Sequence, residues 1–159
     1  MGSQPENWSR SICSSTARNY LGGFTRDPQH CEHAEVSVSK PVVRVVGLGP
    51  SSAEHLTART TELLTLSPVV RLRTRIHPAA EAFSEVASYD DFYDSADSFE
   101  NLYPKIVDDV VQLASTSPNG EVVYAVPGSP MVAERTVELL RLRSEVEVIC
   151  EPAISVIDV

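Results

Sequence analysis

The sequence has few cysteines, few basic residues and no long apolar run, and each shortage excludes a class of protein. The three cysteines among 159 residues are widely spaced and odd in number, which argues against a secreted disulfide scaffold and favours a reducing, cytoplasmic location. Lys and Arg number 13 against 22 Asp and Glu, for a net charge of −9, so we expect no nucleic-acid partner. No stretch reaches the roughly 18 apolar residues of a membrane helix, so we expect no membrane partner.

Residues 1–40 differ in composition from the rest of the chain. They are rich in Ser and show neither helical nor strand period, so we expect a disordered extension. Its arginines resemble those of a transit peptide, but no amphipathic or apolar segment accompanies them, and a misplaced start codon or an expression leader explains the segment as well. The charges of the extension balance, which leaves the whole net charge of −9 to residues 41–159. We therefore expect one acidic domain there.

The remaining chain alternates strand-like and helix-like segments. Residues 42–46 form a nearly continuous β-branched run, which is typical of a buried parallel strand. The other strand-like runs cover residues 68–72, 121–126 and 146–149. Helical spacing predicts one helix that begins at Ser51, capped by Ser51 and Glu54, and further helices over 78–87, 98–114 and 131–143, with a partly buried loop over 88–97.

This alternation predicts right-handed crossovers and an α/β fold, a three-layer unit with a mostly parallel sheet. Ligands of such sheets bind where strands end. Two strand ends here are rich in Gly and Pro, the turns of residues 47–50 and 127–130, and glycine lets a ligand approach the backbone closely because it has no Cβ. Neither turn is a nucleotide fingerprint, because Ser52 stands where a dinucleotide motif needs its third glycine, and the chain has no P-loop.

Four blocks of the chain, in order, resemble the tetrapyrrole (corrin/porphyrin) methylase family. They are similar above all to the methylase domain at the N-terminus of MazG-type proteins, where it precedes a nucleoside triphosphate pyrophosphohydrolase domain. The resemblance extends from Val42 to Asp158, and its last block is the most specific. The blocks are VVGLGPSSAEHLT (45–57), LRTRIHP (72–78), YDDFYDSADSFENLY (89–103) and VVYAVPGSPMVAERTVELL (122–140).

The resemblance implies a class III S-adenosylmethionine-dependent methyltransferase with two α/β lobes, of which the N-terminal lobe is present here. The cofactor, S-adenosyl-L-methionine, would lie in the cleft between the lobes. The sequence departs from the family pattern at Ser51 and Ser52, where Gly-Asp is usual, and at Ala153, where glycine is usual. The cofactor contacts that the resemblance implies are Gly47, Gly49, Pro50, Pro127, Gly128, Ser129, Val132 and Ser155.

A basic cluster follows the second predicted strand. Arg73, Arg75 and His77 are candidates for contacts with an anionic substrate, and the partner we expect is a small-molecule methyl acceptor. In the porphyrinogen-methylating branch of the family an aspartate aligns with Arg73. A base that would deprotonate a macrocycle is therefore not evident, and we assign no catalytic residue.

The resemblance stops where the second lobe of the family would begin. We therefore expect a truncated domain, and either a second copy of the chain (a homodimer) or another polypeptide to supply the missing lobe. The competing interpretation is a catalytically inactive lobe that acts as an interaction module or is the remnant of a MazG-type pyrophosphohydrolase fusion.

We expect no metal site. Glu81 and Glu85 have helical i,i+4 spacing, and Asp90, Asp91, Asp94 and Asp97 follow them, but a solvated acidic face explains these residues better than metal ligands do. Cys13, His30, Cys31 and His33 also lack the spacing of a metal-binding motif.

Overall fold

The computed structural model describes residues 39–96 and 98–159. The expected disordered extension over 1–40, with Cys13 and the His30–His33 segment, lies outside the described residues apart from its last two positions, and so does Asp97. The domain is built on one sheet of four parallel strands in the order β2-β3-β1-β4. The strands are β1 (Val42–Gly47), β2 (Val70–Leu72), β3 (Glu121–Val126) and β4 (Glu147–Cys150).

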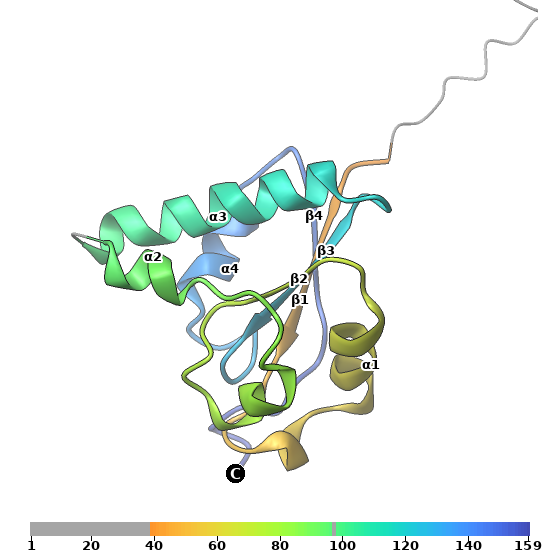
Figure 1. The fold of residues 1–159 in the computed structure, drawn as a ribbon, viewed down its shortest axis with the longest axis vertical. Helices are drawn as coiled ribbons and strands as arrows, with labels where there is room; N and C mark the ends of the chain where they lie inside the picture. The colour runs from red at the N-terminus through yellow and green to blue at the C-terminus, as the bar shows by residue number, and fades with distance from the viewer. Residues whose placement is uncertain (1–38, 97) are drawn as a thin grey trace, which may run out of the picture. The chain divides into compact units, whose positions relative to one another are not determined.

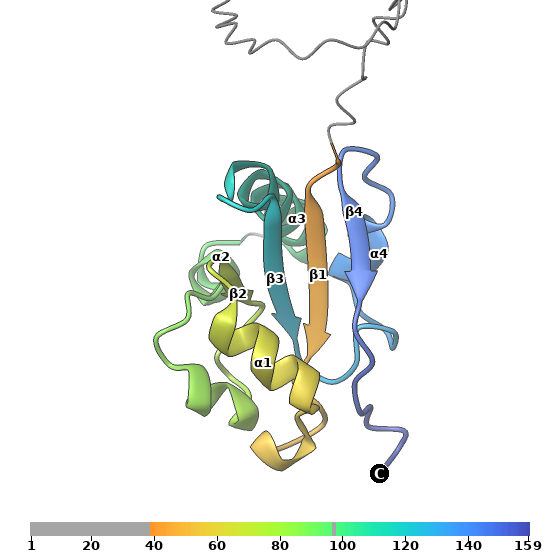
Figure 2. The same ribbon diagram turned by 90° about the vertical axis from the view of Figure 1, so that its right-hand side faces the viewer.

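Helices cover both faces of this sheet, which confirms the predicted three-layer α/β class. Figure 2 shows α1 (Ala58–Leu66) in front of the strands, with α3 (Phe99–Thr116) and α4 (Arg135–Leu140) behind them. The short helix α2 (Asp90–Asp94) precedes α3 (Figure 1). Within the described residues, no helix is both long enough and apolar enough to cross a bilayer.

The core has two parts, one on each face of the sheet. On the α3 and α4 side, Val43 and Val45 of β1 pack with Ile106 and Val110 of α3. On the α1 side, alternate strand residues pack with Leu63 and Leu64, and this cluster includes Val46, Leu72, Val123 and Ala125. Burial on both faces explains why the strands are apolar throughout rather than at every second position.

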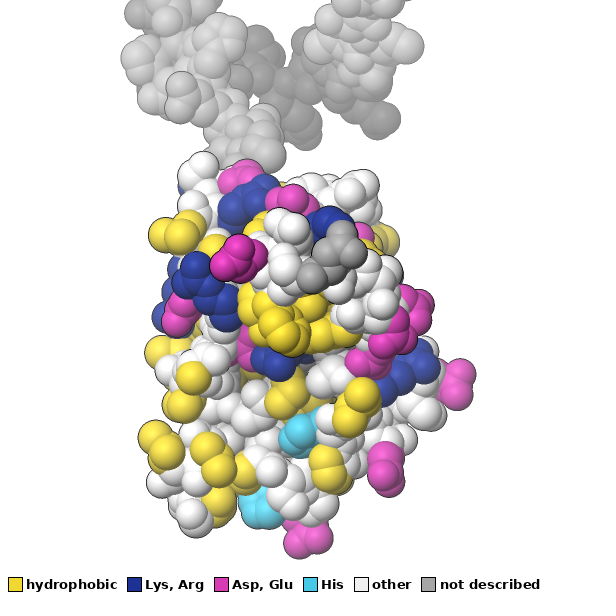
Figure 3. All heavy atoms as spheres, turned by 90° about the vertical axis from the view of Figure 1, so that its left-hand side faces the viewer, with side chains coloured by type: hydrophobic (Ala, Val, Ile, Leu, Met, Phe, Trp, Pro, Cys, Tyr) yellow, Lys and Arg dark blue, Asp and Glu magenta, His cyan; other side chains and the backbone are white. Residues whose placement is uncertain are grey.

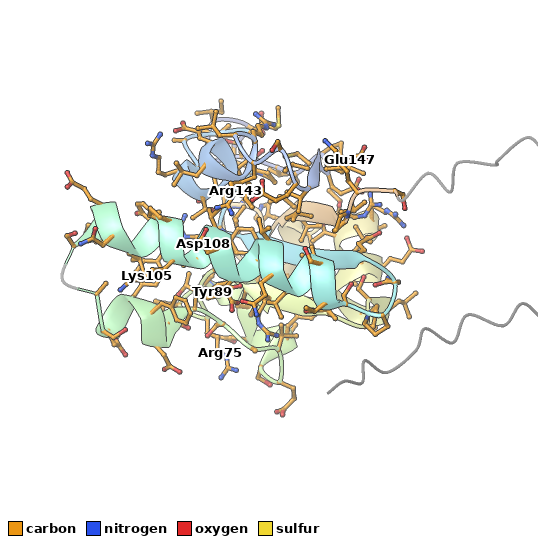
Figure 4. All side chains as sticks on the ribbon, turned by 90° about the horizontal axis from the view of Figure 1, so that it is seen from above. Arg75, Tyr89, Lys105, Asp108, Arg143 and Glu147 are labelled. Atoms are coloured by element: carbon orange, nitrogen blue, oxygen red, sulfur yellow. The ribbon has the colours of Figure 1, made fainter. Side chains whose placement is uncertain are left out.

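Side chains also tie α3 to its neighbours. Tyr89 is 2% exposed, and its hydroxyl donates a hydrogen bond of 2.7 Å to Asp109 Oδ2 of α3. Arg143, which follows α4, forms an ion pair with Asp108 of α3. Figure 4 shows Tyr89, Asp108 and Arg143 around this helix.

The first helix begins later than the sequence predicts. Thr57, not Ser51, is the N-cap of α1, and its side chain accepts a hydrogen bond of 3.1 Å from the Thr60 amide. The residues between them form the 3₁₀ turn η1 (Ala53–His55). The capping box expected at Ser51 and Glu54 is therefore wrong, because the chain makes a separate 3₁₀ turn there and the Thr57 side chain caps α1 instead.

Three other expected boundaries are wrong. Residues 78–83 form the 3₁₀ helix η2 (Pro78–Phe83), so Glu81 and Glu85 do not share an α-helix. The segment predicted as a loop over 88–97 contains α2. The helix predicted from Met131 begins only at Arg135, because Ala133 adopts a left-handed conformation with φ of 51°.

The connections leave the sheet in opposite directions at its centre. β1 and β3 are neighbours, yet the chain leaves β1 toward α1 on one face and leaves β3 toward α4 on the other (Figure 2). The carboxyl ends of two such strands form a topological switch point, the place where open α/β sheets bind ligands. The two Gly- and Pro-rich turns follow these two strands.

Candidate functional site

The two turns at the switch point are joined by their backbones. The Gly49 amide donates to the Gly128 carbonyl at 3.1 Å, and the Gly128 amide donates to the Gly49 carbonyl at 2.9 Å. Both glycines are left-handed, with φ of 73° and 69°, a conformation that other residues adopt only with strain. The turns therefore form one fixed unit whose two halves come from distant parts of the chain.

Gly47 lies beneath this unit, at the end of β1. A Cβ at this position would come within 2.3 Å of the Gly128 carbonyl oxygen and 2.5 Å of the Ala153 Cβ. The absence of a side chain at Gly47 thus leaves space for the methyl group of Ala153.

A pocket of about 360 Å³ opens above the joined turns, within the range of about 300–1,000 Å³ that is typical of ligand sites. Four segments of the chain line it: the turn after β1, His77 from the segment after β2, residues between Pro127 and Ala133, and the pair Ser155 and Val156. Gly47 is the one predicted cofactor contact that does not line it. The lining is Gly49, Pro50, His77, Pro127, Gly128, Ser129, Val132, Ala133, Ser155 and Val156.

His77 brings the segment after β2 to the same pocket. Its Nδ1 accepts a hydrogen bond of 3.2 Å from the Ala79 amide. Burial lowers the pKa of the His77 imidazole, and a hydrogen bond with the Gly49 backbone opposes part of this effect. The lowered pKa favours the neutral imidazole over the imidazolium.

A second pocket of about 360 Å³ is lined by other residues of the same segment. Asp90 organises its wall, since its carboxylate accepts hydrogen bonds from the Thr74 hydroxyl, the Arg75 amide (2.9 Å) and the Ser88 hydroxyl (2.8 Å). Burial alone would raise the pKa of Asp90, but these hydrogen bonds hold it below its ordinary value. The lining is Arg73, Thr74, Ile76, Asp90, Tyr93 and Asp94.

The three candidate substrate residues do not line a single pocket, since Arg73 lines the second pocket and His77 the first. Arg73 lines the second pocket and forms an ion pair with Glu134, which is buried. Burial would lower the pKa of Arg73, but the charge of Glu134 raises it overall. Arg75 lines neither pocket, and its guanidinium donates to the Val86 carbonyl at 2.8 Å; Figure 4 shows it at the edge of the domain.

Sequence reasoning missed several residues of the two pockets. Thr74, Asp90 and Tyr93 line the second pocket or its wall, and Ala133 lines the first. Asp90 and Tyr93 lie in an acidic, aromatic segment where nothing in the sequence distinguishes them from their neighbours, and nothing in the sequence marks Thr74 or Ala133 as a pocket residue. Only the folded structure, which brings these residues to the two pockets, identifies them.

A protein-family model described as Tetrapyrrole (Corrin/Porphyrin) Methylases matches residues 42–159. The chain is also 39% identical over 109 residues to the Uncharacterized protein YabN of Bacillus subtilis (strain 168), a match that covers 66% of this chain and 22% of that protein. The chain thus spans about a fifth of the length of this curated relative.

Solved structures of methyltransferases have a similar fold. Uroporphyrin-III C-methyl transferase from Thermus thermophilus, in complex with S-adenyl homocysteine, is 27% identical with a TM-score of 0.50, over 71% of this chain and 48% of that one. The native form of the same enzyme is 25% identical with a TM-score of 0.51, over 72% of this chain and 49% of that one. Precorrin-6Y methylase from Archaeoglobus fulgidus, at 23% identity and a TM-score of 0.50 over 74% and 55% of the two chains, shows the fold alone.

The matches to the two uroporphyrin-III C-methyl transferase structures cover about half of each of those chains. The family model, in contrast, matches every element from β1 to the C-terminal segment that contains Ser155. The chain belongs to the tetrapyrrole (corrin/porphyrin) methylase family.

Proposed function

We propose that residues 39–159 are the N-terminal lobe of an S-adenosylmethionine-dependent methyltransferase and that the pocket above Gly49 and Gly128 holds the cofactor. One observation carries this proposal. Three segments that are far apart in the sequence, each implied as a cofactor contact by its motif, line a single pocket at the switch point of the sheet.

The residues of the pocket suit a cofactor of this kind. Apart from Gly128 itself and its two chain neighbours, no atom of the described residues lies within 4 Å of the place where a Gly128 Cβ would stand, so the backbone there is open to a ligand. The Gly49 amide donates to the Gly128 carbonyl and the Gly128 amide donates to the Gly49 carbonyl, which makes the two turns rigid before a ligand arrives. When bound, S-adenosylmethionine supplies an activated methyl group, and a rigid backbone pocket contributes to transfer by holding the two reactants in line.

The methyl acceptor is a small molecule that we place in the second pocket. The segment from Arg73 to His77 lines both pockets, so an acceptor there would lie beside the cofactor. The positive charge of Arg73 is balanced by Glu134. The pocket therefore favours an acceptor with hydrogen-bonding groups over one that is recognised by net negative charge.

A second candidate function is that of an interaction module or an inactive lobe of a MazG-type protein. Exposed apolar side chains near the first pocket favour it: Met131 is 63%, Val156 68% and Ile157 77% exposed. Apolar side chains also gather on the face drawn in Figure 3, beside basic and histidine side chains. Such surfaces fit a second copy of the chain or another polypeptide.

A cytoplasmic location remains our proposal from the low cysteine content.

Titration calorimetry of the full chain with S-adenosylhomocysteine and S-adenosylmethionine tests the first candidate. We expect saturable binding that Gly128→Val weakens by at least about tenfold, about 1.4 kcal/mol, because the added side chain would occupy the pocket. Gly120→Val is the matched control, since Gly120 is also left-handed and also has open space at its Cβ position but lies outside the pocket. Well-folded chain that binds neither compound would leave the interaction module as the better account.

A further inference from the structure

We propose that Glu134 is a positioning residue that couples the cofactor pocket to the second pocket. The proposal rests on the function proposed above and adds to it a residue that lines neither pocket. Glu134 follows Ala133, which lines the first pocket, and its carboxylate contacts Arg73, which lines the second.

The carboxylate of Glu134 is held on both oxygens. Its Oε1 accepts hydrogen bonds from the Thr136 hydroxyl at 2.7 Å and the Thr136 amide at 3.3 Å, and its Oε2 pairs with Arg73 Nη1. The side chain is 3% exposed. A buried carboxylate with this many partners fixes the position of its own backbone, because releasing it would leave a buried charge without compensation.

The backbone just before Glu134 needs such an anchor. Ala133 is left-handed, with φ of 51°, and among the described residues it is the one non-glycine with a positive φ. This conformation is sparsely populated for alanine and persists only where the surroundings enforce it. This residue also redirects the chain just before α4 begins. As a result, Val132 and Ala133 line the first pocket while Glu134 is buried.

The other end of the ion pair has unused hydrogen-bonding capacity. The Arg73 amide donates to the Ala125 carbonyl at 2.8 Å, which fixes its backbone to β3. Arg73 Nε and the Tyr93 hydroxyl are buried and find no hydrogen-bond partner within the described part of the chain. Glu134 thus holds Arg73 through Nη1, while the buried Nε of Arg73 has no partner among the described residues.

Two consequences follow from this arrangement. If Glu134 loses its charge, Ala133 is released from its left-handed conformation and the wall of the cofactor pocket loosens. If Ala133 is then replaced by glycine, which adopts positive φ without strain, part of the pocket geometry returns without the ion pair. The two substitutions should therefore be non-additive in their effect on cofactor affinity.

The test is a double-variant cycle on the full chain, with two readouts. The variants are Glu134→Gln, Ala133→Gly and the double variant, and the control is Glu138→Gln, which removes a solvent-exposed ion pair with Arg135 in the same helix. We measure affinity for S-adenosylhomocysteine, and amide hydrogen exchange over residues 131–137 without ligand.

We expect Glu134→Gln to weaken binding about tenfold and to accelerate exchange, Ala133→Gly to recover part of the affinity in the double variant, and Glu138→Gln to change neither. Unchanged affinity and exchange in Glu134→Gln, or a lower melting temperature alone, would overturn the proposal. If the unmodified chain binds no ligand, the proposed function fails. Exchange then decides the role of Glu134, since an unchanged rate in Glu134→Gln overturns it and a faster rate supports it as the anchor of Ala133.

Discussion

At the scale of single residues, the lack of a side chain at Gly47 allows the end of β1, the turn after β3 and the segment of Ala153 to pack against one another. The hydrogen that Gly47 carries in place of a side chain allows the Gly128 carbonyl and the Ala153 methyl group to approach β1. We expect Gly47→Ala to destabilise the fold by about 1–3 kcal/mol, as overpacking of a close contact does. Urea unfolding of the full chain measures this difference.

Gly120→Ala provides the control for this substitution. Its Cβ would stand in open space, and its φ of 67° adds only the strain of the left-handed conformation. We therefore expect a smaller loss, of about 1 kcal/mol. An unfolding midpoint of Gly47→Ala that equals that of the unmodified chain would show that the loops can separate without cost.

Some residues of the site were predictable from sequence, and others were not. Gly49 and Gly128 stand out because each follows an apolar strand, and a glycine in that place signals a turn. Glu134 gives no such signal. Carboxylates are rarely buried, and its partner Arg73 lies 61 positions away, so only the folded chain brings the pair together.

At the scale of secondary-structure elements, the cap of α1 distinguishes two candidate helix starts. Thr57 caps the helix through its side chain, whereas Ser51 is exposed and precedes the 3₁₀ turn. We expect Thr57→Ala to destabilise the domain by about 1 kcal/mol, the typical value of an N-cap, and Ser51→Ala to have no measurable effect. Thermal unfolding of both variants tests this, and equal losses would contradict the assignment of the cap.

The long helix was predicted more accurately than the short ones. The 18 residues of α3 carry a continuous buried stripe, and the predicted helix over 98–114 matches it closely. The five residues of α2 and the six of α4 have too few turns to show a period. Helices this short depend on tertiary packing: α2 directly follows the buried Tyr89, and α4 begins only after the left-handed turn at Ala133.

At the scale of the whole molecule, alternation of strands and helices correctly predicted a parallel sheet with helices on both faces. Alternation does not determine the order of the strands, because a crossover can place the next strand on either side of the last. The order β2-β3-β1-β4 places β1 beside β3 and so creates the switch point. The pocket is therefore a property of the topology, and its sequence signature is only the pair of Gly- and Pro-rich turns.

The central claim is that this switch point binds the methyl donor. Nuclear magnetic resonance of the isotope-labelled full chain, titrated with S-adenosylhomocysteine, tests it most directly. The account predicts amide shift changes concentrated at Gly49, Gly128, Ser129, Val132 and Ser155, with little change along α3. Shift changes that instead map to the separate hollow of about 300 Å³ at Phe99, Tyr103 and Leu139, or no changes at saturating ligand, would contradict it.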